Sequence, residues 1–565
     1  MIDKNHRKLP KYLSHILVSL LSTHLSFLGI AMMAEQAHSA ETIHVNLGPV
    51  ERTISVDDIE TFAEEGELPD ELKDLNRVLD DEVIQQIRQL LKQPIAVSAL
   101  EVSQLTYAPL GEDFLERLGT IIQTESGQNG FYALRSAVIL ASNEPEGFTL
   151  INGLHYFPTE GIRINLVAVF EIIRELNTFT NIRDTTLEAI ARQSAQEIES
   201  SPDIDFSQLP DLQQLGEYAV QKQELILTDE SRSSLLNANE RQFNVDLYLP
   251  NDTSQPVPVI GISHGLGAQR SEFSVLANHL ASHGFAVFVP EHVGSNAELG
   301  QLIQSGQYFG KPDAIEFIDR PQDISFVLDE LERFSQTESD FQNRLDLSQV
   351  GIIGHSFGGY TALALAAGEI NEDQLGETCS SNTPTLNLSL ILQCQAVELP
   401  PASINLSDSR ISAILALNPV SSAVLGSEGF SQVDVPVMMV QSSQDILTPM
   451  VPEQLIPFSW LTTEDKYLVT LVPGGHGSAN QAETFEENLA NSLLTGPNTD
   501  LGSRYTRALS VAFMQRYVSN QSSYASYLNA AYPAYMSQEM LNVNLVTNSI
   551  EIPGFSDRPT ASLQN

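Results

Sequence analysis

The order of apolar and polar residues divides the chain into two regions. From residue 41 to about residue 200, apolar side chains recur at helical spacing, as in the stripe from Val83 to Leu91 that Pro94 ends. Similar stripes run from Tyr132 to Ala141 and from Leu166 to Leu176. We therefore expect a smaller, mainly helical N-terminal domain at residues 41–200, with the stripes as its core faces.

Short β-branched runs replace this pattern beyond residues 201–222, a stretch with Ser201, Pro202 and Pro210 that we interpret as a linker. The runs Glu224 to Leu227 and Asn244 to Leu249 predict an antiparallel opening pair of strands. Further apolar runs predict strands at 257–263, 285–289, 350–353, 411–417, 435–441 and 467–472. Because helical segments lie between most of them, the pattern predicts an α/β domain at about residues 223–540, with a mainly parallel sheet and helices on both faces. A C-terminal tail is expected at 541–565.

One connection in this second domain is unusually long. It runs from Gly368, at the end of a predicted helix, to the strand that begins at Ile411. We predict a cap or lid at about residues 369–410, with a surface insertion as the alternative. The insertion contains Cys379 and Cys394, the only cysteines of the chain, which would form one disulfide bond in an exported protein.

The first forty residues resemble a secretion signal. Four basic residues stand before a mostly apolar stretch from Ile16 to Met33, and the small-residue stretch Ala37 to Ala40 offers a cleavage site. We expect removal of residues 1–40 and export to the periplasm or the extracellular space. A retained anchor is the alternative, which His24 and several serines in the apolar stretch disfavour. No later segment is long and apolar enough to predict a membrane span.

Composition narrows the possible partners. Of the 565 residues 42% are hydrophobic, as in a globular protein, and the 72 acidic against 29 basic residues give a net charge of −43. This charge disfavours binding to nucleic acid or to an anionic membrane surface. We interpret it as an adaptation for solubility.

A candidate nucleophile lies directly after the predicted strand at 350–353. The segment Gly354-His355-Ser356-Phe357-Gly358 matches G-x-S-x-G and precedes a helical stretch. A strand-to-helix turn this sharp needs small neighbours, which Gly354 and Gly358 provide, and it exposes the hydroxyl of Ser356 above the sheet. An ordinary Gly-Ser turn is the alternative.

A serine nucleophile needs a base and an acid that follow it along the chain. His476 is the only histidine after Ser356, and it lies in a loop just beyond the last predicted strand. Asp445 follows the strand at 435–441 and is our candidate acid, with a turn-capping aspartate or a carboxylate on the insertion as alternatives.

An oxyanion hole requires two backbone N–H groups. Phe357, directly after the nucleophile, is one candidate donor. The second is Leu266, or its neighbour Gly265, in the glycine-rich turn that ends at Gly267. We expect His264 to hold this turn by hydrogen bonds in preference to performing acid–base chemistry.

These residues resemble those of platelet-activating-factor acetylhydrolases and dienelactone-hydrolase-like esterases. The resemblance covers about residues 224–480, and its motifs are Ser-His-Gly-Leu-Gly at 263–267, Leu-Ala-Ser-His-Gly-Phe at 280–285, Glu-His at 291–292 and Gly-His-Ser-Phe-Gly-Gly at 354–359. The N-terminal region resembles a domain that precedes such hydrolases in cyanobacteria. The resemblance implies an α/β-hydrolase fold and hydrolysis of carboxylic esters, including short acyl groups on phospholipids. One position departs from it, because Asn418 stands where the acetylhydrolases carry their acid.

The sequence thus predicts a serine hydrolase that cleaves a small-molecule or lipid ester through an acyl-enzyme, with no cofactor and no metal. A peptidase or amidase with the same triad is the first alternative, and a non-catalytic envelope binding protein is the second. The residue pattern fixes neither the acyl chain, the alcohol nor the oligomeric state.

Overall fold

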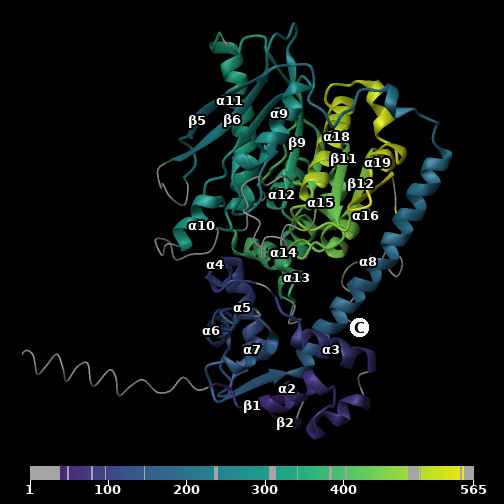
Figure 1. Cartoon of the computed structure of the whole chain (residues 1–565). Helices are drawn as coiled ribbons and strands as arrows, with labels where there is room; N and C mark the ends of the chain where they lie inside the picture. Colours follow the sequence, from purple (N-terminus) through teal and green to yellow (C-terminus); the bar gives the residue numbers. More distant parts are fainter. Residues whose placement is uncertain are drawn as a thin grey trace, which may run out of the picture. The chain divides into compact units, whose positions relative to one another are not determined.

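The computed structural model describes residues 39–47, 50–77, 81–95, 97–107, 109–145, 147–233, 240–304, 313–339, 341–380, 385–400, 404–480 and 498–547, with residues 496, 550 and 552. The predicted signal segment lies almost wholly outside the described residues, as does most of the predicted tail. The chain divides into two compact units (Figure 1). One comprises residues 1–99 and 119–166, and the other comprises residues 100–118 and 167–565.

The N-terminal unit contains a four-stranded sheet in the order β2-β1-β4-β3. Strands β1 (Thr42–Leu47) and β2 (Val50–Ser55) pair antiparallel, and β1 pairs parallel with β4 (Gly161–Asn165). Strand β3 (Ile122–Thr124) completes the sheet beside β4. Its helical elements are α2 (Val56–Glu65), η1 (Asp70–Arg77), α3 (Asp81–Lys92), α6 (Phe131–Ala141) and α7 (Leu150–His155).

The region 41–200 is mainly helical, as predicted, but it also contains this small sheet, which the sequence analysis did not predict. The strands are three to six residues long, which is too short to show the alternating apolar pattern of a strand beside the longer helical stripes. The limits of the units also differ from the predicted limits of 41 and 200. Helices α4 (Ala99–Tyr107), α5 (Pro109–Ile121) and α8 (Leu166–Ser200) belong wholly or largely to the second unit.

The second unit is built on a nine-stranded sheet in the order β13-β12-β11-β10-β9-β7-β8-β6-β5. The predicted opening pair is confirmed as β5 (Val220–Asp229) and β6 (Arg241–Pro250), which run antiparallel. The other predicted strands are confirmed within a few residues of their expected limits: β7 (Val257–Ser263), β8 (Ala286–Pro290), β9 (Leu345–His355), β10 (Ile411–Leu417), β11 (Val437–Ser442) and β12 (Lys466–Val472). Neighbours from β8 through β12 pair in parallel, as the alternation of strands and helices predicts.

Two hydrophobic cores cover the two faces of this sheet. Along β7 the side chains of Val257 and Val259 enter one core and those of Ile260 and Ile262 enter the other, because successive residues of a strand face opposite sides. The first core includes α11 (Glu316–Thr337), α12 (Phe357–Ala367) and α15 (Ser422–Gln432), and the second includes α9 (Ser274–Ser282) and α18 (Thr499–Tyr517). The two-sided helical cover expected from the sequence is confirmed.

The predicted linker and the start of the predicted C-terminal tail both contain regular structure. In the predicted linker, η2 (Phe206–Gln208) buries Phe206 against the rings of Tyr527 and Tyr532. Strand β13 (Asn542–Thr547) pairs antiparallel with β12, so the start of the predicted tail is part of the sheet. Apart from the helices of the predicted insertion, the other short helical elements described in this unit are η3 (Arg270–Phe273), α10 (Ala297–Gln304), η5 (Val451–Leu455), α16 (Ile456–Trp460), η6 (Ser522–Tyr527) and α19 (Ala531–Met536).

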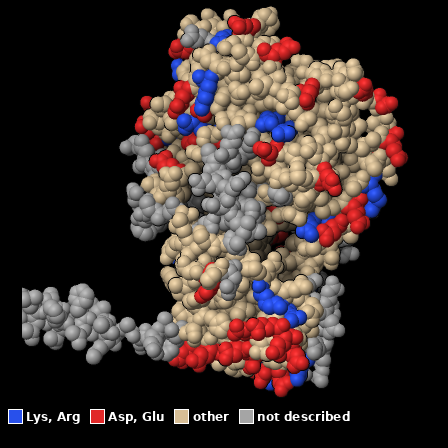
Figure 2. Space-filling view, in the orientation of Figure 1, with Lys and Arg blue, Asp and Glu red and all other residues tan. Residues whose placement is uncertain are grey.

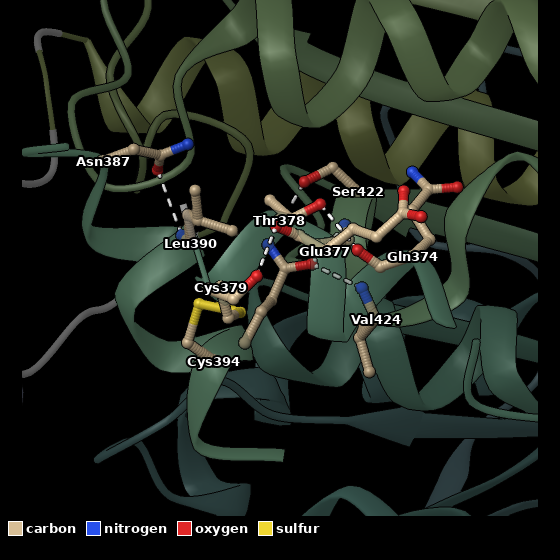
Figure 3. The surroundings of a disulfide bond; sticks show 12 residues. Gln374, Glu377, Thr378, Cys379, Asn387, Leu390, Cys394, Ser422 and Val424 are labelled. Atoms are coloured by element: carbon tan, nitrogen blue, oxygen red, sulfur yellow. Dashed lines mark hydrogen bonds between the residues drawn. A yellow bond between two sulfur atoms is a disulfide. The ribbon is translucent and has the colours of Figure 1, made fainter. Parts of the chain in front are cut away.

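The predicted insertion contains α13 (Glu372–Ser380), α14 (Leu388–Gln393) and η4 (Cys394–Glu398). The predicted disulfide is present, because Cys379 and Cys394 join the end of α13 to the start of η4 (Figure 3). Asn387 caps α14 by accepting a hydrogen bond from the amide of Leu390. The insertion is therefore folded and packs beside α15, and its action as a lid stays a prediction.

Acidic side chains gather over one part of the N-terminal unit, around α2 and the segment that follows it (Figure 2). Exposed carboxylates there include Asp57, Asp58, Glu64, Glu65 and Glu67. Within the described part of the chain, no helix combines the length and the apolar character needed to cross a bilayer.

Replacing both cysteines by serine should lower the free energy of unfolding by at most about 3 kcal/mol, since the bond closes a loop of sequence separation 15. Denaturant titrations of the wild type and the double variant measure this difference. Added reductant should bring the wild type to the stability of the variant and leave the variant unchanged. Two free thiols in mass spectra of protein from an oxidising compartment would contradict the bond.

Candidate active site

Ser356 lies in a sharply bent turn between β9 and α12. Its backbone has φ 56° and ψ −119°, a conformation that a non-glycine residue adopts only when its surroundings hold it there. A Cβ on Gly354 would lie 1.9 Å from the carbonyl oxygen of Gly358, and one on Gly358 would lie 2.0 Å from that of Ser263. Both glycines of the G-x-S-x-G segment are therefore required by close backbone approach, as the sequence predicts for a nucleophile elbow.

Hydrogen bonds from the neighbouring strand hold this turn in place. The amide of Ser356 donates to the carbonyl of Leu417 at 2.9 Å, and the amide of Val420 donates to the carbonyl of Ser356 at 3.1 Å. Both partners lie at the carboxyl end of β10. The strained backbone is thus paired on both sides of the serine.

His476 follows β12, and its ring pairs with Asp445. The Nδ1 atom of His476 lies 2.8 Å from Oδ2 of Asp445, and both side chains are largely buried. The backbone carbonyl of His476 accepts hydrogen bonds from His355 at 3.0 Å and from Asn418 at 2.8 Å. These contacts place the backbone of His476 against His355, the residue that directly precedes Ser356.

Asp445 accepts four hydrogen bonds in all. Its Oδ1 accepts from the amides of Leu447 and Thr448 at 2.9 and 2.8 Å, and its Oδ2 accepts from the hydroxyl of Thr448 at 2.7 Å as well as from His476. The aspartate thus combines the turn-capping geometry, which the sequence left open as the alternative, with a direct contact to the imidazole. These hydrogen bonds fix the orientation of the carboxylate relative to the imidazole.

Thr448 is a site residue that the sequence analysis missed. Its hydroxyl, which donates to Asp445, lies 3.2 Å from Nδ1 of His476 and 3.2 Å from the carbonyl oxygen of Asn418. The signal was its place three residues after the candidate acid, where a turn returns a side chain to the aspartate.

The predicted oxyanion turn lies against the elbow. A Cβ on Gly265 would be 3.3 Å from the Cβ of Ser356, so only a glycine leaves free space between the two. The far end of the turn is fixed by Gly267, whose amide donates to the carbonyl of Ser295 at 2.8 Å. Leu266 lies between these two positions, and Phe357 begins α12 directly after the serine.

His264 is fully buried and holds the turn. Its Nδ1 donates to the carbonyl of Gly265 at 2.8 Å, and its Nε2 accepts from the amide of His292 at 3.0 Å, so both ring nitrogens are used. Burial, together with the positive charge of Arg320, lowers the pKa of His264 well below its usual value. These contacts favour the structural role that the sequence suggested over acid–base chemistry.

A buried group of charges beneath this turn was not predicted. Arg241 pairs with Asp323 at 2.7 Å and with Glu316 at 3.1 Å, and Asp323 also accepts from Nδ1 of His292 at 3.0 Å. Burial lowers the pKa of His292 to about 3 despite that carboxylate. The signal in the sequence was the set of charged residues on one face of α11, at spacings of three, four and seven: Glu316, Asp319, Arg320 and Asp323.

No group of three or more histidine, cysteine or acidic side chains is arranged to hold a metal ion among the residues that the structure describes.

Comparison with known proteins agrees with this fold. Residues 39–165 match a family described as an alpha/beta hydrolase of unknown function (DUF1400), and residues 228–330 match the family of platelet-activating factor acetylhydrolase, isoform II. The chain thus has an α/β-hydrolase fold and is similar to esterase-like members of that class. The second match includes the oxyanion turn and the buried charges but ends before Ser356.

Individual proteins that are similar to parts of this chain also carry hydrolase names. The platelet-activating factor acetylhydrolase of Cavia porcellus is 33% identical over 157 residues, which is 22% of this chain and 34% of the relative. Hydrolyase poxO of Penicillium oxalicum is 32% identical over 25% of this chain and 31% of the relative. Cutinase est1 of Thermobifida alba is 29% identical over 21% of this chain and 34% of the relative. The chain thus spans about a third of the length of the curated relatives it matches.

Two substitutions test which residue is the acid. Asp445→Asn should keep the fold yet lower kcat by roughly 10⁴-fold, because the imidazole loses its anionic partner and its preferred tautomer. Asn418→Ala should lower kcat by no more than about tenfold, since it removes two hydrogen bonds of about 1 kcal/mol each. One is to the hydroxyl of Ser442, and the other is to the carbonyl of His476, which His355 still contacts. Kinetics of both variants on one activated ester compare the two positions. Near wild-type turnover of Asp445→Asn would move the acid elsewhere.

Proposed function

We propose that this protein is a serine-dependent hydrolase of carboxylic esters, with Ser356 as nucleophile, His476 as general base and Asp445 as acid. The observation that carries the proposal is the 2.8 Å contact between Asp445 and His476, made on a loop whose carbonyl is held by the residue preceding Ser356. The acetylhydrolase and cutinase names of similar proteins support an ester as the substrate class.

In the proposed reaction, Ser356 Oγ attacks the ester carbonyl carbon while His476 Nε2 takes the hydroxyl proton. The amides of Phe357 and Leu266 stabilise the oxyanion of the tetrahedral intermediate. Collapse breaks the bond to the alcohol, which leaves with the proton from His476. Water, activated by His476, then attacks the acyl-enzyme and releases the carboxylic acid product, and the proton returns to Ser356.

Within this class we propose a small-molecule or lipid ester with a short acyl group as the substrate, including the 2-acetyl ester of a glycerophosphocholine. The resemblance to acetylhydrolases in the segment 228–330 supports this choice. We further propose that the protein acts after export, in the periplasm or outside the cell. The disulfide bond Cys379–Cys394 is compatible with such an oxidising compartment.

Purified full-length protein should hydrolyse p-nitrophenyl esters, fastest for short acyl chains, and a fluorophosphonate should label Ser356. Ser356→Ala should lower turnover by at least about 10⁴-fold and abolish labelling while the fold persists. Ser348→Ala is the matched control, a serine on the same strand β9 that bonds only Asp346, and it should retain wild-type turnover.

The same assay includes peptide p-nitroanilides and a 1-alkyl-2-acetylglycerophosphocholine. Faster turnover of the anilides than of every ester would replace the esterase by an amidase or peptidase with the same triad. Absence of both turnover and label in the wild type would contradict the proposed function and favour a binding protein.

A further inference from the structure

Arg320, on α11, is a fully buried arginine outside the proposed triad. Its guanidinium contacts both chain segments that carry the candidate oxyanion donors. The proposed triad does not account for a charge at this place, because Arg320 touches none of the three proposed catalytic side chains in the contacts described below.

The first set of contacts fixes the glycine-rich turn. One Nη of Arg320 donates to the carbonyl of His264, and the other donates to the hydroxyl of Ser295 at 2.9 Å. The carbonyl of Ser295 in turn accepts from the amide of Gly267 at 2.8 Å. Arg320 therefore holds both ends of the three-residue turn in which the amide of Leu266 lies.

The second set fixes the start of α12. The guanidinium lies over the ring of Phe357, 4.6 Å from its centroid. Its Nε donates to the hydroxyl of Thr361 at 3.3 Å, and that hydroxyl donates to the carbonyl of Phe357 at 3.1 Å. Both the side chain and the carbonyl of Phe357 are thus tied to the same guanidinium.

Arg320 keeps its charge in this buried setting. Burial lowers its pKa to about 10, opposed by the carboxylates of Glu316, Asp323 and Glu291 and assisted by the nearby charge of Arg241. The neighbouring imidazoles of His264 and His292 have lowered pKa values and stay neutral. Arg320 therefore stays charged and these two imidazoles stay neutral across the neutral pH range.

We propose that Arg320 is a positioning residue that sets the separation of the Leu266 and Phe357 amides and so assembles the oxyanion hole. This proposal rests on the proposed esterase function. A planar guanidinium supplies donors in a fixed fork, which is what three partners in different directions require. An ammonium at the same place carries the charge from a single point and cannot span the same partners.

The test compares Arg320→Met, Arg320→Lys and the matched control Arg410→Met. Arg410 also lies in an ion pair and contacts α11 through the carbonyl of Ser325, but it precedes β10, at the opposite end of that strand from Asn418. The measurements are kcat and KM on p-nitrophenyl acetate, normalised to sites titrated with a fluorophosphonate, and the pH profile of kcat.

We expect kcat per titrated site to fall about 100-fold in Arg320→Met and at least tenfold in Arg320→Lys, with KM changed by less than about threefold, in line with the loss of an oxyanion donor. Phosphonylation of Ser356 should slow in parallel, because its transition state uses the same two amides. The midpoint of the pH profile should not move, since the base and the acid are intact. Arg410→Met should lose stability and keep wild-type kcat per site.

A merely structural role would reduce the number of titratable sites and leave kcat per site unchanged, and this result would overturn the proposal. If Arg320→Met does not fold, Ser295→Ala and Thr361→Val remove one contact each with the arginine in place. Each should lower kcat per site about three- to tenfold, and unchanged values in both would equally overturn it. An inactive, unlabelled wild type would contradict the proposed function and this proposal together, whereas an active wild type with unaffected variants contradicts this proposal alone.

Discussion

The strained backbone of Ser356 is the constraint on which the candidate site depends. A non-glycine residue stays at φ 56° only if tightly packed partners prevent relaxation, and here Gly354, Gly358 and the carbonyl of Ser263 meet at distances that admit no Cβ. The parallel register of β7, β9 and β10 fixes that meeting point, because Ser263 pairs with Gly354 and Leu417 pairs with His355. The carboxyl ends of five parallel strands therefore place the glycine-rich turn, Ser356, Asn418, Asp445 and His476 at one edge of the sheet.

Residues at strand ends were predictable for this reason. Ser356, Asp445 and His476 each follow a β-branched run, and in a parallel sheet such positions meet whatever their separation along the chain. Features that depend on tertiary contacts were not predictable in the same way. The N-terminal strands are too short to show a period, and β13 joins the sheet only by pairing with β12. The charged residues on α11 find their partners only in the folded chain, where Arg241 and His292 from distant elements pair with Asp323. Thr448 was missed because a threonine in a turn carries no chemistry until the imidazole stands beside it.

Asn418 illustrates how one position can change role without disturbing its neighbours. It is fully buried, holds φ 43°, and donates from its amide nitrogen to the carbonyl of His476. A carboxylate there could only accept hydrogen bonds, and it would face that carbonyl with a negative charge. The amide at 418 and the carboxylate at 445 are therefore complementary. One holds the backbone of the histidine loop and the other holds its ring, so the departure from the acetylhydrolase pattern has a physical counterpart in the contacts of His476.

Buried and exposed charges of this chain differ in how strongly salt affects them. A chain with 72 acidic and 29 basic residues has few cations to place, yet Arg241 and Arg320 are fully buried and Arg232 is partly buried. Their carboxylate neighbours are Asp229, Glu316, Asp319 and Asp323. Exposed carboxylates such as those around α2 are screened by salt within about 10 Å at 0.1 M ionic strength, whereas buried pairs are screened far less. The repulsion among exposed charges of a chain with net charge −43 thus depends on ionic strength. The buried ion pairs of Arg241 depend on it far less. The geometry of the candidate site is in this way insulated from the surface charge that surrounds it.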